Sequence, residues 1–318
     1  MKVINSTMKH EWAKYINSFQ DEKNGFYIGP EIVEDELASK VHSREHILYH
    51  LICHVLPALD LLNAKPRYVL KFAHKYLNTV YLERWLNERN WANAWLEGNN
   101  LLFVMQLLVY LRDMEGKSEA YAALNFLFDW LDKQQDPMTG LWGTNGFCDN
   151  FAAMCGGYHQ LIGYFFLNKD IQYKKTLIDT VLSLQHRDGG FNPRGGGGAC
   201  EDVDGVFILV NLYQQLDYKR KDIKHALEKN LKNIMRNHMR DGGFVYRKNK
   251  RFSHMGILKT QSPKNKSNMF ATWFRVHTIA LISQVLDNTI YSEIEWNFNR
   301  AFSMGWCNTI KDKGYTDV

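Results

Sequence analysis

Apolar and polar residues follow two kinds of helical pattern along this chain. Residues 119–133 and 221–237 are apolar on one face and polar on the other, which is typical of an amphipathic helix. Another set of segments is apolar on nearly every face, namely residues 101–110, 154–167, 206–216 and 269–286. Because a helix that is apolar all round must be enclosed by other elements, the pattern predicts an outer ring of amphipathic helices around an inner ring of enclosed helices.

A short motif recurs along the chain, near the ends of the amphipathic segments. It is a Gln or His followed five residues later by glycine and then aromatic residues, and it occurs at Gln20/Gly25, Gln135/Gly140, Gln185/Gly190 and His238/Gly243. The last three copies are about fifty residues apart, which is room for two helices and a turn. The first interval is about twice as long, so a degenerate copy is expected at residues 81–91, and a partial copy at residues 296–306.

We interpret the motif as part of the scaffold. Its glycine can adopt the positive φ that ends an outer helix, its aromatic ring can pack between repeats, and its Gln can bond to backbone at the next helix terminus. Helical hairpins that repeat in this way close naturally into a ring of about six pairs. The sequence therefore predicts an all-α (α/α)6 toroid, with residues 1–318 forming a single domain.

Composition and charge narrow the class of protein. The chain has 318 residues, 45% of them hydrophobic, and a net charge of +5 that comes from scattered basic residues. Its short basic runs, at residues 219–224 and 248–251, are typical of solvated surfaces, so we expect no nucleic-acid partner. The five cysteines and the lack of an apolar leader near Met1 favour a cytoplasmic protein. Residues 46–62 are too short and too polar to span a bilayer, although contact with a membrane surface and the oligomeric state stay open.

Two motifs carry a resemblance to known proteins. Residues 130–142, with Trp130, Gln135 and Trp142, resemble the QW repeat of squalene and oxidosqualene cyclases. Residues 185–205, which contain Asp-Gly-Gly-Phe and Val-Asp-Gly, resemble the repeat of protein prenyltransferase β subunits. Over about residues 12–306 the chain is thus similar to the terpenoid cyclase and protein prenyltransferase α/α-toroid superfamily, which implies the same fold.

The resemblance also bears on metals and cofactors. In prenyltransferase β subunits the matching segment supplies an Asp and a Cys as zinc ligands, and a later helix supplies a His. Here Asp204 is present, but Val206 and Ala271 stand at the thiolate and imidazole positions. A zinc ion would lack two of its three protein ligands. We therefore expect no metal site and no cofactor, with Mg²⁺ entering only if the substrate is a diphosphate.

A second resemblance concerns catalysis. Residues 202–205 resemble the Asp-x-Asp-Asp motif of class II terpene cyclases, whose middle Asp protonates an alkene or epoxide. Asp204 occupies that position, Gly205 replaces the last acid, and Glu201 precedes the motif. The resemblance implies a cyclase-like enzyme for an isoprenoid, with Asp204, Asp202 and Glu201 as catalytic residues. Capping of a helix N-terminus is the competing interpretation for Glu201 and Asp202, whereas Asp204 continues into an enclosed apolar helix, where an unpartnered carboxylate is costly.

Other polar and aromatic residues lie on or near the expected inner helices, which should line one cavity. Each alone is more often a packing residue, and convergence of several would make a site. The candidate substrate-binding residues are Arg194, Asn211, Tyr158, His159, Phe207, Trp273, Arg275, His277, Asn100 and His46.

Two other functions remain open at this point. Trp and Tyr rings can stack on sugars while paired acids hydrolyse or eliminate them, so a carbohydrate-active α/α barrel (hydrolase, lyase or epimerase) is one alternative. A non-catalytic toroid that binds a ligand is the other. In every case the expected partner is a small molecule.

Overall fold

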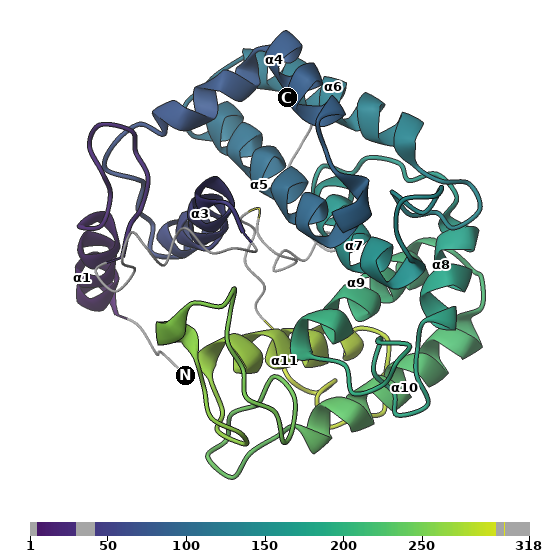
Figure 1. Cartoon of the computed structure of the whole chain (residues 1–318). Helices are drawn as coiled ribbons and strands as arrows, with labels where there is room; N and C mark the ends of the chain where they lie inside the picture. Colours follow the sequence, from purple (N-terminus) through teal and green to yellow (C-terminus); the bar gives the residue numbers. More distant parts are fainter. Residues whose placement is uncertain (1–4, 30–41, 297–301, 303–318) are drawn as a thin grey trace.

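The helices of this protein form two concentric rings (Figure 1). The structure, a computed structural model, describes residues 5–29, 42–296 and 302. Within these residues there is no β-strand, and extended pairing is confined to four isolated bridges. The predicted all-α toroid is confirmed for the part of the chain that is described.

Five helices form the inner ring of the described chain. They are α3 (Arg44–Leu61), α5 (Ala94–Asp113), α7 (Asn150–Phe166), α9 (Ala199–Gln215) and α11 (Met269–Ile282). The sequence pattern predicts four of them, all but α3, to be enclosed. Most residues of α5, α7 and α9 are buried whichever way they point, as the all-round apolar pattern requires.

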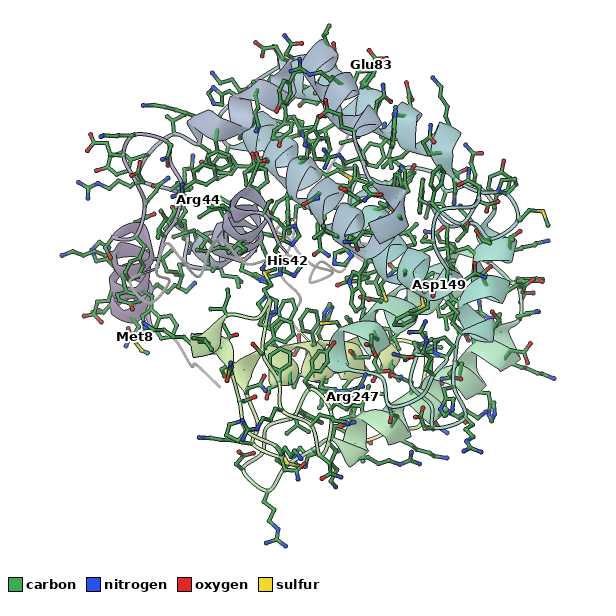
Figure 2. The ribbon with its side chains drawn as sticks, viewed as in Figure 1. Met8, His42, Arg44, Glu83, Asp149 and Arg247 are labelled. Carbon is green, nitrogen blue, oxygen red and sulfur yellow. The ribbon has the colours of Figure 1, made fainter. Side chains whose placement is uncertain are left out.

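The outer ring carries the amphipathic helices. They are α1 (Ser6–Asn17), α4 (Thr79–Asn87), α6 (Glu119–Gln134), α8 (Lys174–Ser183) and α10 (Arg220–Arg236), with short 3-10 turns η1 (Lys71–Leu77), η2 (Trp91–Asn93) and η3 (Leu258–Thr260) between elements. Figure 2 shows Glu83 of α4 on the outer side of the ring and His42, just before α3, near its centre. Charged faces thus meet solvent, and the inner helices face the middle.

Neighbouring inner helices pack against one another in order from α3 to α11. The approach of α5 to α7 depends on two glycines, because a Cβ at Gly98 would overlap the backbone of Gly156. The two ends of the row meet through aromatic rings, since His54 of α3 and Trp273 of α11 have centroids 5.7 Å apart. These contacts hold the starts of all five inner helices around one space.

The repeated glutamines hold the turns of the scaffold, as predicted. Gln135 Nε2 donates to the carbonyl oxygen of Gly140 (2.8 Å) within its own turn and to that of Gln172 (3.1 Å) just before the next outer helix. Gln20 and Gln185 also make one bond within their own turn and one to a distant carbonyl. Each Gln therefore ties two neighbouring repeats together.

The turn glycine differs from the prediction in the later copies. Gly140 has a φ of 70° as expected, but in the third and fourth copies the positive φ falls on Gly189 (98°) and Gly242 (86°), not on Gly190 and Gly243. The turn is one residue shorter in these copies, and the second glycine of each pair instead approaches a neighbouring side chain. The motif is thus structural throughout, with a small variation in length.

Two further copies of the repeat were expected from the spacing. The degenerate copy at residues 81–91 coincides with α4 and the turn η2, which follows it. The partial copy at residues 296–306 lies almost entirely outside the described residues. No helix within the described ranges is long and apolar enough to cross a bilayer.

Candidate active site

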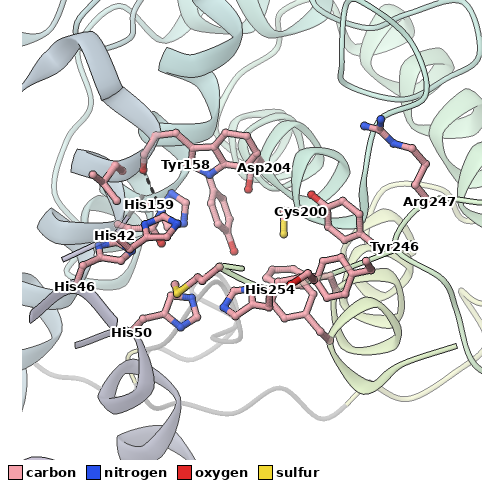
Figure 3. Close-up of a pocket in the computed structure, with 18 of the residues that line it drawn as sticks. His42, His46, His50, Tyr158, His159, Cys200, Asp204, Tyr246, Arg247 and His254 are labelled. Carbon is pink, nitrogen blue, oxygen red and sulfur yellow. Dashed lines mark hydrogen bonds between the residues drawn. The ribbon is translucent and has the colours of Figure 1, made fainter. Parts of the chain in front are cut away.

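A cavity of about 720 Å³ lies where the N-terminal halves of the inner helices converge. All five inner helices, the turn before α5 and the segment 246–255 between α10 and α11 contribute to its wall. Figure 3 shows histidine rings on one side of this space, with Asp204 and Cys200 across from them. A cavity of this size with a few convergent polar groups is typical of a small-molecule site.

Aromatic and imidazole rings make up most of the cavity wall. The rings are those of His42, His46, His50, Trp95, Tyr158, His159, Tyr246, Phe252, His254, Phe270 and Phe274. Several contact one another directly, as when His254 packs on Phe270 with ring centroids 4.5 Å apart. Ring faces of this kind attract positive charge, so the wall suits a cationic species in an otherwise apolar space.

Asp204 is the one carboxylic acid among the described residues that line the cavity. It lies in the second turn of α9 and is only 1% exposed. Desolvation, with smaller contributions from Glu201 and Asp202, raises the pKa of Asp204 well above its usual value. Its Oδ2 atom has no hydrogen-bond partner among the described residues. Burial thus favours the protonated form of this acid, and one of its oxygens is uncommitted.

Two thiols accompany this acid. Cys155 of α7 is a hydrogen-bond partner of Asp204, and Cys200 is a partner of Tyr246. Burial raises the pKa of both thiols well above the usual range. Both remain protonated at neutral pH, which makes them poor nucleophiles.

Asp202 does not reach the cavity, although the sequence made it a catalytic candidate. Its carboxylate accepts bonds from Asn230 Nδ2 (3.0 Å) and Asn233 Nδ2 (3.2 Å) of α10, and it forms an ion pair with Arg275 of α11. The backbone N–H of Phe191 is a further donor, at 3.1 Å. This fully buried aspartate accepts from four donors and so holds α9, α10 and α11 together. We therefore assign Asp202 a structural role and do not include it in the proposed site.

Glu201 takes the capping position that the sequence left open for it. Its carboxylate accepts the backbone N–H of Gly198, at the N-terminus of α9, and lies 3.7 Å from Arg247 Nη2. Burial raises the pKa of Glu201. The residue is not part of the cavity lining, but its contact with Arg247 holds one of the basic side chains that are.

Gly205 replaces the last acid of the class II motif for a steric reason. A Cβ at this position would overlap the ring of Phe191, which is fully buried. Phe191 is the aromatic residue of the third repeat, so the scaffold itself occupies the space that a fourth acidic side chain would need.

The predicted substrate-binding residues divide into two groups. His46, Tyr158 and His159 line the cavity. The others do not line it. Three of them support lining residues or the same helix: Asn100 bonds to His46 from behind, Phe207 packs on Tyr158, and Asn211 bonds to the Phe207 carbonyl. The remaining four lie elsewhere, since Trp273 packs on His54, Arg275 pairs with Asp202, His277 is buried in α11, and Arg194 is exposed beside Asp149. Asn211, which lies two turns along α9 from Asp204, is not in the cavity lining.

Sequence reasoning missed some of the lining residues. His50 could have been found, because His42, His46, His50 and His54 recur every fourth residue and so share one helix face. His254 and the basic side chains Arg247, Lys250 and Arg251 come from an irregular segment. The run at 248–251 has the sequence of a solvated surface, and no periodicity in it indicates that Lys250 and Arg251 line a cavity.

The comparisons with known proteins agree with this architecture. The model of the prenyltransferase alpha-alpha toroid domain family matches residues 74–312. The chain belongs to this family. No curated protein and no solved structure matches it. Membership in the toroid family establishes the fold, whereas the reaction depends on the residues of the site.

A zinc site of the prenyltransferase kind does not fit this toroid. Val206 and Ala271, at the two positions where thiolate and imidazole ligands would stand, are fully buried and have no ligating atom. Across the described ranges, no three side chains of His, Cys, Asp or Glu gather so that they could hold a metal ion.

Proposed function

We propose that this toroid is an enzyme that converts a linear isoprenoid in its central cavity by protonating a carbon–carbon double bond or an epoxide. Asp204 is the acid in this proposal. The observation that carries it is the buried carboxyl group, with a raised pKa and a free oxygen, in the wall of a ring-lined cavity. A general acid must be protonated at the working pH, and desolvation of Asp204 favours its protonated form by raising its pKa.

The surroundings of Asp204 suit the carbocation that protonation would create. Tyr158, Phe270 and Phe274 line the cavity with ring faces, which stabilise positive charge without reacting with it. The chain departs from the class II motif at Gly205, and Cys155 is the side chain that accompanies Asp204 here.

The basic segment favours a substrate with an anionic head group. Arg247, Lys250 and Arg251 line the cavity, and the last two are exposed, so they can meet an entering phosphate or diphosphate. A Mg²⁺ ion carried in by a diphosphate would meet one carboxyl group among the described lining residues, that of Asp204, which the proposed reaction needs in its protonated form.

The carbohydrate alternative has less support from the site. Hydrolysis of a glycoside uses two carboxyl groups on either side of the bond that breaks, about 5 to 10 Å apart. Glu201 and Asp202 are both engaged away from the cavity, by Gly198 and by Arg275. Among the described lining residues Asp204 has no second carboxylate to work with.

The experiment is incubation of the protein with farnesyl or geranylgeranyl diphosphate in D₂O buffer, followed by mass spectrometry of the extracted products. Acid-initiated chemistry places one deuterium from the solvent on the product carbon that accepts the proton. Asp204→Asn should give no product. Release of the diphosphate without incorporation of deuterium would contradict the proposal, as would turnover of acidic oligosaccharides alone.

A further inference from the structure

A chain of four side chains ends at His46 in the cavity wall. Arg89 Nη1 donates to Glu97 Oε2 (3.0 Å), and Asn100 Nδ2 donates to the same oxygen (2.9 Å). Asn100 Oδ1 lies 2.8 Å from His46 Nδ1. Two contacts fix the end of this chain that is farther from His46. The backbone N–H of Asn90 donates to Glu97 Oε1 (3.0 Å), and the Arg89 guanidinium stacks on the ring of Trp85.

The partners in this chain determine which nitrogen of His46 carries its hydrogen. A carboxylate only accepts hydrogen bonds, so the group that Asn100 turns toward Glu97 must be its NH₂. The amide oxygen then faces His46, and because that oxygen is also only an acceptor, Nδ1 must be the donor. The neutral ring therefore has its lone pair on Nε2.

We place the Nε2 atom of His46 on the cavity side of the ring, because Nδ1 is committed to Asn100. His46 lines the cavity, and the structure gives Nε2 no hydrogen-bond partner among the described residues. Burial and the neighbouring His42 lower the pKa of His46 to about 4, with Asn100 and Glu97 acting in the opposite direction. The ring is thus neutral at physiological pH and available as a base on the side of the cavity opposite Asp204 (Figure 3).

The other histidines of the wall are not held in this way. His50 and His254 contact each other through their rings (4.8 Å between centroids), and neither ring has a charged partner among the described residues. His159 Nδ1 donates to the Cys155 carbonyl (2.7 Å) one turn earlier in the same helix, a common packing arrangement. The His46 ring is connected through Asn100 to the buried carboxylate of Glu97, which strengthens the imidazole as it takes up a proton.

We propose that His46 is the base that ends the reaction, and that Glu97 and Asn100 are positioning residues that orient it. This inference rests on the proposed function. Asp204 gives its proton to a substrate carbon and leaves a cation. His46 Nε2 then removes a proton from a carbon next to the cationic centre, and the electrons of that C–H bond form a new double bond. After the product leaves, the imidazolium releases its proton to solvent and Asp204 takes one up, so the net reaction is an isomerisation that ends in an alkene.

The first test compares His46→Phe with His54→Phe, a matched change two turns further along α3 at a residue that does not line the cavity. With farnesyl or geranylgeranyl diphosphate in D₂O, His46→Phe should make the wild-type alkene about a hundredfold more slowly or worse. Deuterium should still appear, in alcohols or displaced alkenes, because Asp204 is intact. His54→Phe should keep the wild-type product.

The outcomes separate the two proposals. If the wild type turns over and His46→Phe forms the same alkene at a similar rate, the base assignment is overturned and the acid remains. If the wild type forms no deuterated product from either probe, the proposed function fails and the base assignment fails with it.

The second test needs no substrate. In ¹⁵N NMR spectra the signal of His46, assigned by its loss in His46→Phe, should show a hydrogen on Nδ1 and none on Nε2. Asn100→Leu removes the acceptor, so the hydrogen should move to Nε2, and the product ratio of the enzyme should change while KM stays nearly constant. A wild-type His46 that carries its hydrogen on Nε2 would overturn the proposed orientation.

Discussion

Asp202 and Arg275 form an ion pair in which both side chains are completely buried. The pair joins the first turn of α9 to α11, and Arg275 Nη2 also donates to the Tyr246 carbonyl (3.0 Å), where the basic segment begins. One buried cation therefore fixes both the helix that carries Asp204 and the start of the segment 246–255, which also lines the cavity. A buried ion pair of this kind is most important when one partner is removed, because the other is left without compensation.

Arg275→Met should lower the free energy of unfolding by about 3 to 5 kcal/mol, because Asp202 would be left buried without its cation. Urea denaturation monitored by circular dichroism measures this change. Arg194→Met is the control, since that side chain is exposed and its loss should change stability by about 0.5 kcal/mol or less. A loss below about 1 kcal/mol for Arg275→Met would mean that the pair contributes little to the fold.

Asp204 should make the stability of the protein depend on pH. Burial raises its pKa in the folded state, so above about pH 4 the unfolded chain loses a proton that the folded chain keeps. Rising pH then favours unfolding, by up to about 1.4 kcal/mol per pH unit, until the pH reaches the folded pKa. Asp204→Asn has no carboxyl group at this position, so its stability should not show this decrease with rising pH.

The measurement is urea denaturation of the wild type and Asp204→Asn at about pH 5 and about pH 8. The variant should gain stability relative to the wild type as the pH rises. A difference that stays constant with pH would show that Asp204 ionises normally in the folded protein, and would remove the neutral acid from the mechanism.

His54 should make the protein less stable as the pH falls. Burial lowers its pKa to about 4, from 6.5 in its unperturbed state. Between these values the unfolded chain binds a proton that the folded chain does not, so stability falls as the pH falls from 6.5 toward 4. As the pH falls from about 7 to about 5, the free energy of unfolding of His54→Phe should therefore rise by about 2 kcal/mol relative to that of the wild type. Thermal melts at the two pH values check this, and parallel shifts for both proteins would contradict it.

Gln135 should contribute to stability through backbone groups alone. Gln135→Ala leaves the carbonyls of Gly140 and Gln172 without their side-chain donor, which should cost about 1 to 3 kcal/mol. Gln172→Ala is a matched control because that side chain is exposed. Equal unfolding midpoints for the two variants in urea would argue against the scaffold role of the repeated glutamines.

The ring could be predicted from sequence because its determinants are local. Helical periodicity and the turn motif at Gln135 both act over a few residues, and each repeat supplies the same information again. The position of Asp204 in the wall followed from the same argument, since it continues into an enclosed helix.

The rest of the site depends on contacts between residues far apart in the chain. Nothing near Asp202 in the sequence indicates that Arg275, more than seventy residues later, takes up its charge. His254 reaches the cavity on an irregular segment that no periodicity describes. Glu97 reads as an acid in the first turn of a helix, and its importance to His46 appears only when α3 and α5 are placed side by side.

The overlap between Phe191 and any side chain at position 205 makes these two positions interdependent in evolution and in engineering. Restoring an acid by Gly205→Asp alone would push the Phe191 ring out of the core and damage the third repeat before any catalytic benefit could appear. Replacing Phe191 alone by a smaller residue would open a void, at about 3 to 5 kcal/mol for Phe→Ala. A second acid beside Asp204 at position 205 therefore requires both substitutions together, an acid at position 205 and a smaller side chain at position 191.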